Sequence, residues 1–228
     1  MSVVTEAVRF ASGELTLVGV LHRPDDSNLE RRASNFELRR PGVAVCHPHP
    51  LYGGDMENNV VVALCRALAA GGLTALRFNF RGVEGSGGSH GGGLAEREDA
   101  RAALDFLAGL DAVDGECLGL AGYSFGALVA LSASDERLRA LAAVSPPAGG
   151  LDIASVQRGV PTLLISGDRD EIAPAARLPE MAASLQLLTP KDEVRSVAGA
   201  DHFWWGHEEA LAAAVVEFFR GHLLESES

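Results

Sequence analysis

Residues 117–131 read CLGLAGYSFGALVAL, and this stretch decides the fold. It begins as a short apolar strand and ends with a helical composition, and Ser124 lies at the junction within the pattern G-x-S-x-G. A tight strand-to-helix turn strains such a serine, and glycines two residues to either side remove the side chains that would collide there. The helix N-terminus behind the serine favours an anionic intermediate. The stretch therefore predicts a nucleophile at Ser124.

The same pattern occurs again at residues 87–91, where its central residue is Ser89. No strand leads into this copy, no helix opens directly behind it, and it lies in the glycine-rich segment 82–93. Because the pattern alone is weak in a chain with 26 glycines, the flanking strand and helix must decide between the two copies. We interpret Ser89 as a loop residue.

Strand and helix patterns alternate along the chain, with Asp55 and Pro174 as predicted helix starts. After an N-terminal β-hairpin and a polar loop over 25–41, we predict strands over 42–47, 73–79, 116–122, 139–145, 161–166 and 194–198. Helices are predicted over 55–70, 94–109, 125–134, 174–186 and 207–223. This alternation is typical of an α/β fold whose mostly parallel sheet carries helices on both faces, with the hairpin antiparallel at one edge. The length fits a single domain over 1–228.

A nucleophilic serine needs a general base and a carboxylate that orients the base. Behind a strand-to-helix elbow these follow in the order Asp or Glu, then His. Asp168, Asp170 and Glu171 follow the strand 161–166, and we choose Asp170. Asp168 fits a turn residue that bonds within its own loop, and Glu171 fits a helix approach or a rim charge. The alternative is that all three are only loop residues.

Three histidines follow Asp170, and His202 is the only one directly after a strand. His207 fits the start of the terminal helix and His222 lies near its end, so His202 is the predicted base. It is followed by three consecutive aromatic residues, Phe203, Trp204 and Trp205. They either wall an apolar substrate pocket or pack against the last helix.

The loop HPHPLYGG at 47–54 is the expected source of one oxyanion-hole N–H, and Phe125 of the other. The prolines have no N–H, which leaves His49 or Leu51, and we favour His49. Leu51, Tyr52 and Tyr123 join the possible pocket residues. A metal between the two histidines of this loop would need a further ligand, and none stands at helpful spacing, so neither a metal nor a cofactor is predicted.

The formal net charge of −12 argues against a nucleic-acid partner, and the basic stretch from Arg31 to Arg40 fits a solvated loop. Cys46, Cys65 and Cys117 all lie in apolar stretches without metal spacing, as expected of buried reduced thiols. We see no signal peptide and no apolar stretch of membrane-spanning length. A cytoplasmic protein without a membrane partner, monomeric or homodimeric, is therefore expected.

Five motifs in order, HPHPLYGG, RFNFRGVEGSGGS, GYSFGA, GDRDEIAP and GADHFW, resemble those of the α/β-hydrolase superfamily. The chain is most similar to its small, lidless bacterial members related to dienelactone hydrolases and carboxylesterases, over residues from about 43 to 220. The resemblance implies the triad Ser124, Asp170 and His202. Dienelactone hydrolases carry cysteine at the elbow, so lactone hydrolysis by their route is not implied. The usual cap position, here Ser145 to Pro161, is too short for a cap domain, which predicts an open site.

Together these features predict a serine hydrolase that cleaves carboxylic ester or thioester bonds of small or exposed acyl substrates through an acyl-enzyme. Acyl transfer to another acceptor and peptide hydrolysis are alternatives on the same triad, because one fold supports many chemistries. A binding protein that kept the fold and lost turnover is a third alternative. Loss of a triad residue would be its mark, and all three residues are present.

Overall fold

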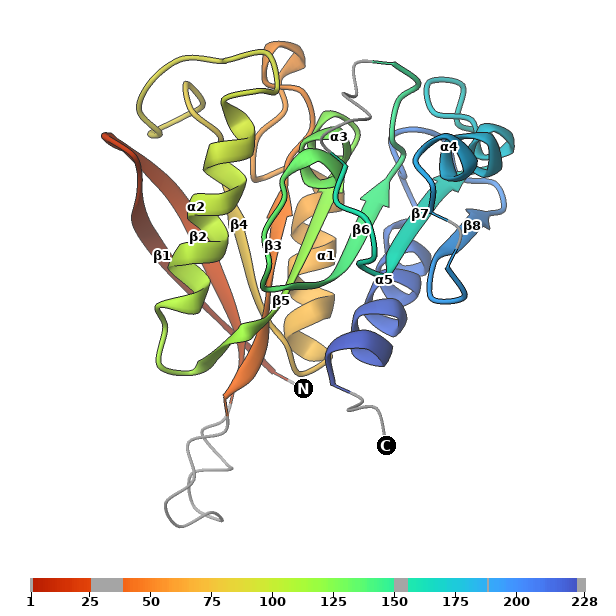
Figure 1. Ribbon diagram of the computed structural model, residues 1–228. Helices are drawn as coiled ribbons and strands as arrows, with labels where there is room; N and C mark the ends of the chain where they lie inside the picture. The colour runs from red at the N-terminus through yellow and green to blue at the C-terminus, as the bar shows by residue number, and fades with distance from the viewer. Residues whose placement is uncertain (1, 26–38, 150–155, 188, 225–228) are drawn as a thin grey trace.

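The computed structural model describes residues 2–25, 39–149, 156–187 and 189–224. Its centre is an eight-stranded sheet with the strand order β1-β2-β4-β3-β5-β6-β7-β8 (Figure 1). The β1–β2 and β2–β4 pairs are antiparallel and the other pairs are parallel, which confirms the predicted fold class. In chain order the strands span Val3–Ser12, Leu15–Pro24, Arg40–Cys46, Thr74–Phe78, Val113–Tyr123, Leu138–Val144, Thr162–Gly167 and Glu193–Val197.

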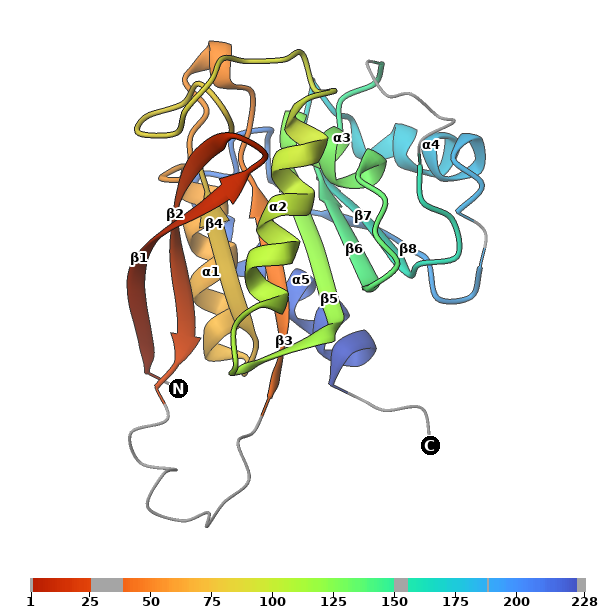
Figure 2. The ribbon, with the colours of Figure 1, turned by 60° about the vertical axis from the view of Figure 1, so that its left-hand side comes forward.

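Helices cover both faces of the sheet because its strands alternate their apolar side chains. In β3, Val43 and Val45 point to one face, while Ala44 and Cys46 point to the other. Helices α1 (Asn59–Ala70) and α5 (Glu208–Leu223) cover the first face. The second face carries α2 (Glu96–Ala108), α3 (Phe125–Ser132) and α4 (Leu178–Ser184), as Figures 1 and 2 show. The result is a three-layer sandwich of helices, sheet and helices.

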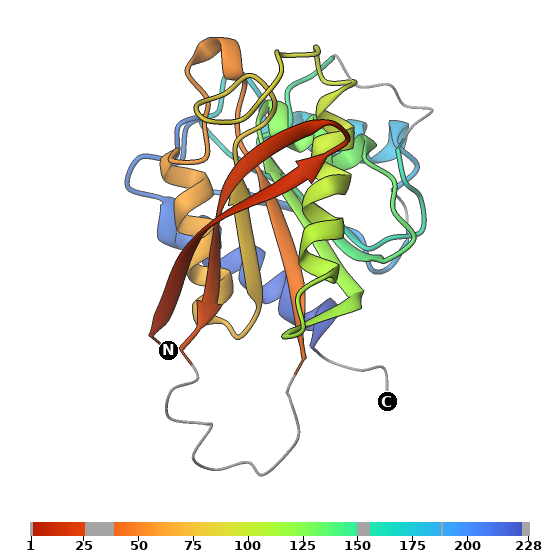
Figure 3. The ribbon, with the colours of Figure 1, turned by 90° about the vertical axis from the view of Figure 1, so that its left-hand side faces the viewer.

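The N-terminal hairpin forms one edge of the sheet, and Figure 3 views the molecule from that side. Gly13 has a φ of 58° at its turn, a conformation that glycine adopts without steric cost. Phe10 on β1 packs between Phe78 of β4 and Phe106 of α2, at ring-centroid distances of 5.9 and 5.2 Å. The hairpin is thus joined to the core by aromatic packing as well as by the β-ladder.

The starts of two helices were predicted at the wrong residues. Helix α1 begins at Asn59 and its cap is Asn58, whose side chain accepts a hydrogen bond from the N–H of Val60. Asp55 closes a separate turn by accepting from the N–H of Glu57. The two residues are the same kind of cap, and only the loop geometry distinguishes them.

The predicted helix over 174–186 is shorter than expected. Pro174 precedes a 3-10 turn over Ala175–Arg177, and α4 begins only at Leu178. Pro179 explains the late start, because proline fits the first turn of a helix but breaks its interior.

The predicted loop over 25–41 also ends earlier than expected. Strand β3 begins at Arg40 and includes Pro41, while residues 26–38, with Arg31, lie outside the described residues. Strands β6 and β7 are joined by the short interval after Val144, so no cap domain stands there. Part of this interval, residues 150–155, is also outside the description.

The three cysteines are free thiols. Cys46 and Cys65 are buried in β3 and α1, and Cys117 is half-buried in β5. Burial raises the pKa of the Cys65 thiol to about 12, so this thiol is protonated and packs as an apolar side chain. Among the described residues, no helix has the length and apolarity needed to cross a membrane.

Candidate active site

Ser124 occupies a strained turn between β5 and α3. Its φ of 54° and ψ of −116° lie in a region that non-glycine residues rarely adopt. A β-carbon on Gly122 would lie 2.0 Å from the carbonyl oxygen of Gly126, and one on Gly126 would lie 2.4 Å from that of Cys46. Both glycines are therefore required by close backbone approach. The turn presents the Ser124 hydroxyl at the carboxyl edge of the sheet.

The structure brings Ser124, His202 and Asp170 into one hydrogen-bonded chain. Ser124 Oγ lies 3.1 Å from Nε2 of His202, and Nδ1 of His202 lies 3.0 and 2.9 Å from the two oxygens of Asp170. The three residues come from the loops after β5, β7 and β8, which end at the same edge of the sheet. The hydroxyl of Tyr123 donates to the backbone oxygen of His202 at 2.6 Å and so ties the base to the elbow strand.

Asp170 is buried and ionised. Burial by itself would raise its pKa, but hydrogen bonds from His202 and from the N–H of Ala173 outweigh burial and lower the pKa to about 2. One carboxylate oxygen also accepts from the N–H of Ile172 at 2.9 Å. A charged carboxylate at this position holds the proton of His202 on Nδ1, so that Nε2 is free to accept the proton of Ser124.

The other acidic and histidine candidates are not part of this hydrogen-bonded triad. Asp168 accepts from the N–H of Gly199 at 2.7 Å, so it bonds to the loop after β8 and not within its own loop as predicted. Glu171 is exposed. His207 directly precedes α5, without a capping hydrogen bond from its side chain, and His222 packs on Phe218 near the end of that helix. Ser89 is an exposed loop residue with no helix behind it.

The N–H of Phe125 and the loop after β3 lie close together, as the predicted oxyanion hole requires. Phe125 is the first residue of α3, and the first N–H groups of a helix have no partner within it. The His49 ring lies 4.7 Å from that of Phe125, measured between centroids. The N–H of Leu51 already donates to Nδ1 of His49, which leaves the N–H of His49 as the better of the two predicted donors.

His47 is a structural residue. Its Nδ1 lies 2.7 Å from the oxygen of Pro48, and its Nε2 accepts from the N–H of Phe80 at 3.1 Å. Burial lowers its pKa to about 4, so the ring is neutral near pH 7. Since both ring nitrogens are used, His47 cannot act as a metal ligand with His49 in this conformation.

A cavity of about 330 Å³ opens beside the two proposed oxyanion donors. It lies between the glycine-rich loop and α3, a region that the sequence reasoning did not assign to substrate. One face of α3 lines the cavity with Phe125, Leu128, Val129 and Ser132. Their helical spacing is the feature of the sequence that could have indicated this face. The lining residues are His49, Gly92, Gly93, Leu94, Arg97, Phe125, Leu128, Val129 and Ser132.

The predicted pocket residues fall into two groups, and two of them were wrong. Trp204 is fully buried with a φ of 62°, and its indole Nε1 donates to Ser145 Oγ at 3.1 Å. Tyr123 is also buried. Neither can line an open pocket, because both pack in the core on the α1 and α5 side of the sheet. The remaining four are exposed large side chains on loops around the triad: Leu51, Tyr52, Phe203 and Trp205.

A second pair of a histidine and a carboxylate lies on the cavity side of the elbow. Glu96, at the start of α2, is fully buried and accepts from the N–H groups of Gly91 and Gly93, each at 2.7 Å. Nδ1 of His90 lies 2.9 Å from Glu96. The His90 ring packs 5.1 Å from that of His49. This pair was not predicted, because Glu96 reads as an ordinary acidic residue of a first helical turn.

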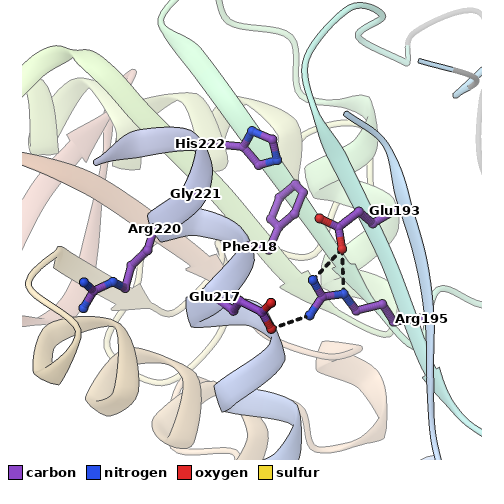
Figure 4. Close-up of a pocket in the computed structure, with 7 residues that line it drawn as sticks. All are labelled: Glu193, Arg195, Glu217, Phe218, Arg220, Gly221 and His222. Carbon is purple, nitrogen blue, oxygen red and sulfur yellow. Dashed lines mark hydrogen bonds and ion pairs between the residues drawn. The ribbon is translucent and has the colours of Figure 1, made fainter. Parts of the chain in front are cut away.

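A second cavity, of about 350 Å³, lies between β8 and the end of α5 (Figure 4). It contains Arg195, which donates to Glu193 at 2.6 Å and to Glu217 at 2.9 Å. Glu193 is the first residue of β8, so this cavity lies at the opposite end of the strand from the triad. Arg195 is paired with both glutamates and no serine or cysteine lines the cavity, so it does not compete as a nucleophilic site.

Comparison with known families agrees with this geometry. The X-Pro dipeptidyl-peptidase (S15) family matches residues 21–169, which is more than half of the chain and includes the elbow. The chain belongs to this family. The S15 match ends before Asp170 and His202, so the assignment of these two residues rests on their distances to Ser124.

Similar proteins place this S15 member among the lidless serine hydrolases of the α/β-hydrolase superfamily. XC6422 from Xanthomonas campestris, described as an α/β serine hydrolase without lid, is 30% identical with a TM-score of 0.81, covering 98% of this chain and 97% of that one. An α/β serine hydrolase homologue from Coxiella burnetii is 32% identical with a TM-score of 0.74, covering 93% and 96%. An uncharacterised Rickettsia prowazekii protein, RP471, is 34% identical over 82% of each chain.

Proposed function

We propose that this serine hydrolase cleaves carboxylic esters or thioesters with small or exposed acyl groups. The observation that carries the proposal is the arrangement around Ser124. Its hydroxyl lies 3.1 Å from the base, at an uncapped sheet edge, next to a largely apolar cavity that begins at Phe125. An ester carbonyl placed between these groups would meet the nucleophile on one side and N–H donors on the other.

In the proposed reaction, Ser124 attacks the carbonyl carbon while Nε2 of His202 accepts its proton. The N–H groups of Phe125 and His49 donate to the oxyanion that forms. His202 then returns the proton to the departing alcohol or thiol, leaving an acyl group on Ser124. A water molecule, deprotonated by the same imidazole, releases the acid. Asp170 remains ionised throughout and stabilises the imidazolium.

The cavity beside Phe125 is the proposed acyl site. Its volume of about 330 Å³ lies at the low end of the range for small-molecule sites, which favours a short acyl chain. Leu94, Leu128 and Val129 provide apolar walls for that chain. Leu51 and Trp205 are exposed and do not line this cavity, and they lie on the loops that carry His49 and His202.

Peptide hydrolysis after proline is the second candidate, because the family match favours it. An enzyme that removes dipeptides must hold a free amino terminus, and a carboxylate is the usual partner for an ammonium group. Of the described residues that line the cavity, none is acidic, and Arg97 adds a positive charge. This lining favours the ester over the dipeptide.

The test compares p-nitrophenyl esters of increasing acyl length with Ala-Pro-p-nitroanilide. We expect kcat/KM to be highest for short esters, to exceed that for the anilide, and to fall by several powers of ten in Ser124→Ala. Ser89→Ala, at the second copy of the motif, is the matched control and should keep full activity. Leu128→Trp should shift the optimum to shorter chains by filling the cavity.

Other outcomes identify the alternatives. Faster cleavage of the anilide than of every ester would establish the peptidase. Product ratios with added alcohol or amine separate acyl transfer from hydrolysis. Failure of wild-type Ser124 to react with a fluorophosphonate probe would overturn both candidates and leave a binding protein.

A further inference from the structure

Two buried side chains beneath the triad, Trp204 and Ser145, contact each other and have no part in the reaction described above. Both are fully buried, and the indole Nε1 of Trp204 donates to Ser145 Oγ at 3.1 Å. Ser145 directly follows β6, and Trp204 lies two residues beyond His202. The contact therefore joins two of the loops that surround the catalytic residues.

The hydrogen bonds continue from this pair to Asp170. Ser145 Oγ lies 3.4 Å from Ser166 Oγ, and Ser166 Oγ lies 3.1 Å from Oδ2 of Asp170. Ser166 is also buried and lies near the end of β7, the strand that precedes Asp170. The four side chains thus form a continuous polar path through the core.

The chemistry of tryptophan sets the direction of this path. An indole N–H can only donate, so Ser145 Oγ must be the acceptor of that bond and its own proton points elsewhere. Ser166 has a single hydroxyl proton, which is shared between the oxygen of Ala173 and Oδ2 of Asp170. Ser145 can therefore donate its own proton to Ser166 Oγ, and Ser166 in turn donates to Asp170 or to Ala173. Ser145 is also among the groups that lower the pKa of Asp170.

Backbone strain coincides with this contact. Ser145 and Trp204 have φ values of 47° and 62°, and they are two of the four non-glycine residues with positive φ among those described. Such a conformation is strained for a residue with a β-carbon, and glycine would avoid that strain. A third residue of the four is the nucleophile Ser124 itself. At Ser124, Ser145 and Trp204 the backbone is strained, and a glycine that relieved the strain would also remove the side chain that makes the hydrogen bond.

We propose that Trp204 and Ser145 are positioning residues that, together with Ser166, orient the carboxylate of Asp170 toward His202. Asp170 then presents both oxygens to Nδ1 at 2.9 and 3.0 Å, and the imidazole faces Ser124. Neither residue touches the substrate or the reacting atoms. This inference rests on the proposed hydrolase function for its rate measurements, but its geometry does not depend on which bond is cleaved.

The alternative is that the pair only packs the core, and Ser145→Gly separates the two roles. Glycine relieves the strain at φ 47° but leaves the buried indole N–H of Trp204 without its acceptor, so we expect a loss of stability together with a kcat about tenfold lower and an unchanged KM. Trp204→Phe keeps the ring and removes the N–H, and it should lower kcat in the same way. The double variant should lose little more than either single variant, because both remove one path.

Three further measurements complete the test. The downfield proton resonance of His202 Nδ1 should shift in Ser145→Gly and Trp204→Phe. Both variants should also slow the reaction of Ser124 with a fluorophosphonate, a readout that holds even if no ester proves to be a substrate. Phe219→Leu, a buried aromatic change on the α5 helix, is the control for packing loss and should leave kcat and the resonance unchanged. Normal kcat, probe reaction and resonance in Ser145→Gly, or additive losses in the double variant, would overturn the proposal.

Discussion

Two pairs of a histidine and a carboxylate flank the elbow, and they share several features. Asp170 and Glu96 have fully buried side chains, and each lies 2.9 Å from Nδ1 of its histidine. Each also accepts two backbone N–H groups from its own loop. The pairs differ at both ring nitrogens. Nδ1 of His202 is hydrogen-bonded to Asp170, whereas Nδ1 of His90 is close to Glu96 without the geometry of a hydrogen bond. Nε2 of His202 lies 3.1 Å from Ser124 Oγ. The His90 ring instead packs against the ring of Phe125, with 5.6 Å between the ring centroids.

The difference shows that a histidine–carboxylate pair is not catalytic by its own chemistry. A buried carboxylate beside a histidine holds a general base on one side of Ser124 and a glycine-rich loop on the other. Gly93 of that loop lines the cavity, so Glu96 supports the proposed acyl site and not the proton transfer. Variants of the two pairs should therefore affect different kinetic constants.

Replacing the two histidines gives the largest contrast. His202→Ala should lower kcat/KM by roughly 10⁵-fold or more, because the serine loses its base. His90→Ala should change kcat/KM by less than about tenfold, since His90 contacts only ring faces and Glu96. Steady-state kinetics on a short p-nitrophenyl ester measures both. Equal losses in the two variants would break the distinction between the pairs.

Replacing the carboxylates should separate kcat from KM. Asp170→Asn should lower kcat by roughly 10⁴-fold, because an amide at this position favours the wrong imidazole tautomer. Glu96→Gln leaves one of the N–H groups of Gly91 and Gly93 without its acceptor, and the loosened loop should raise KM severalfold with little change in kcat. A kcat loss in Glu96→Gln as large as that in Asp170→Asn would mean that the second pair takes part in the chemistry.

The smallest expected effect is on stability at acid pH, and it isolates the charge of Asp170. Its pKa falls from about 4 in the unfolded chain to about 2 in the folded protein, so its ionic contribution is full above pH 4 and disappears as the pH falls through 2. The difference in free energy of unfolding between wild type and Asp170→Asn should therefore shrink between pH 5 and pH 2.5, as urea denaturation would show. The exposed Glu171→Gln is the control for a lost surface charge, and a constant difference would contradict this account.

Much of the fold and the triad geometry could be predicted, because each inference depended on the order of strands, helices and polar residues along the chain. Strands of a parallel sheet end at one edge, so residues after β5, β7 and β8 must meet there. That rule selected Asp170 and His202 as partners for Ser124. The same rule separated Ser124 from Ser89, which has no strand before it.

The residues that could not be predicted depend on the direction in which their side chains point. The order of residues along the chain does not determine that direction. Of the three aromatics after His202, the positive φ of Trp204 turns that side chain into the core and leaves Phe203 and Trp205 exposed. Nothing in the sequence marks Ser145, which stands before two prolines, because its role depends on the indole of Trp204 in a distant loop. Glu96 is buried only because residues 91–93 fold over it.

The opposite environments of the two adjacent tryptophans make the enzyme its own optical reporter. Trp204 has no exposed surface and Trp205 is 70% exposed, and the chain contains no other tryptophan. The buried indole should emit at shorter wavelength and resist acrylamide, while the exposed one should emit at longer wavelength and be quenched readily. Red-edge emission then reports changes at the exposed loop after His202, and blue-edge emission reports the integrity of the core beside the triad. One emission spectrum therefore distinguishes a change at this loop from unfolding of the core.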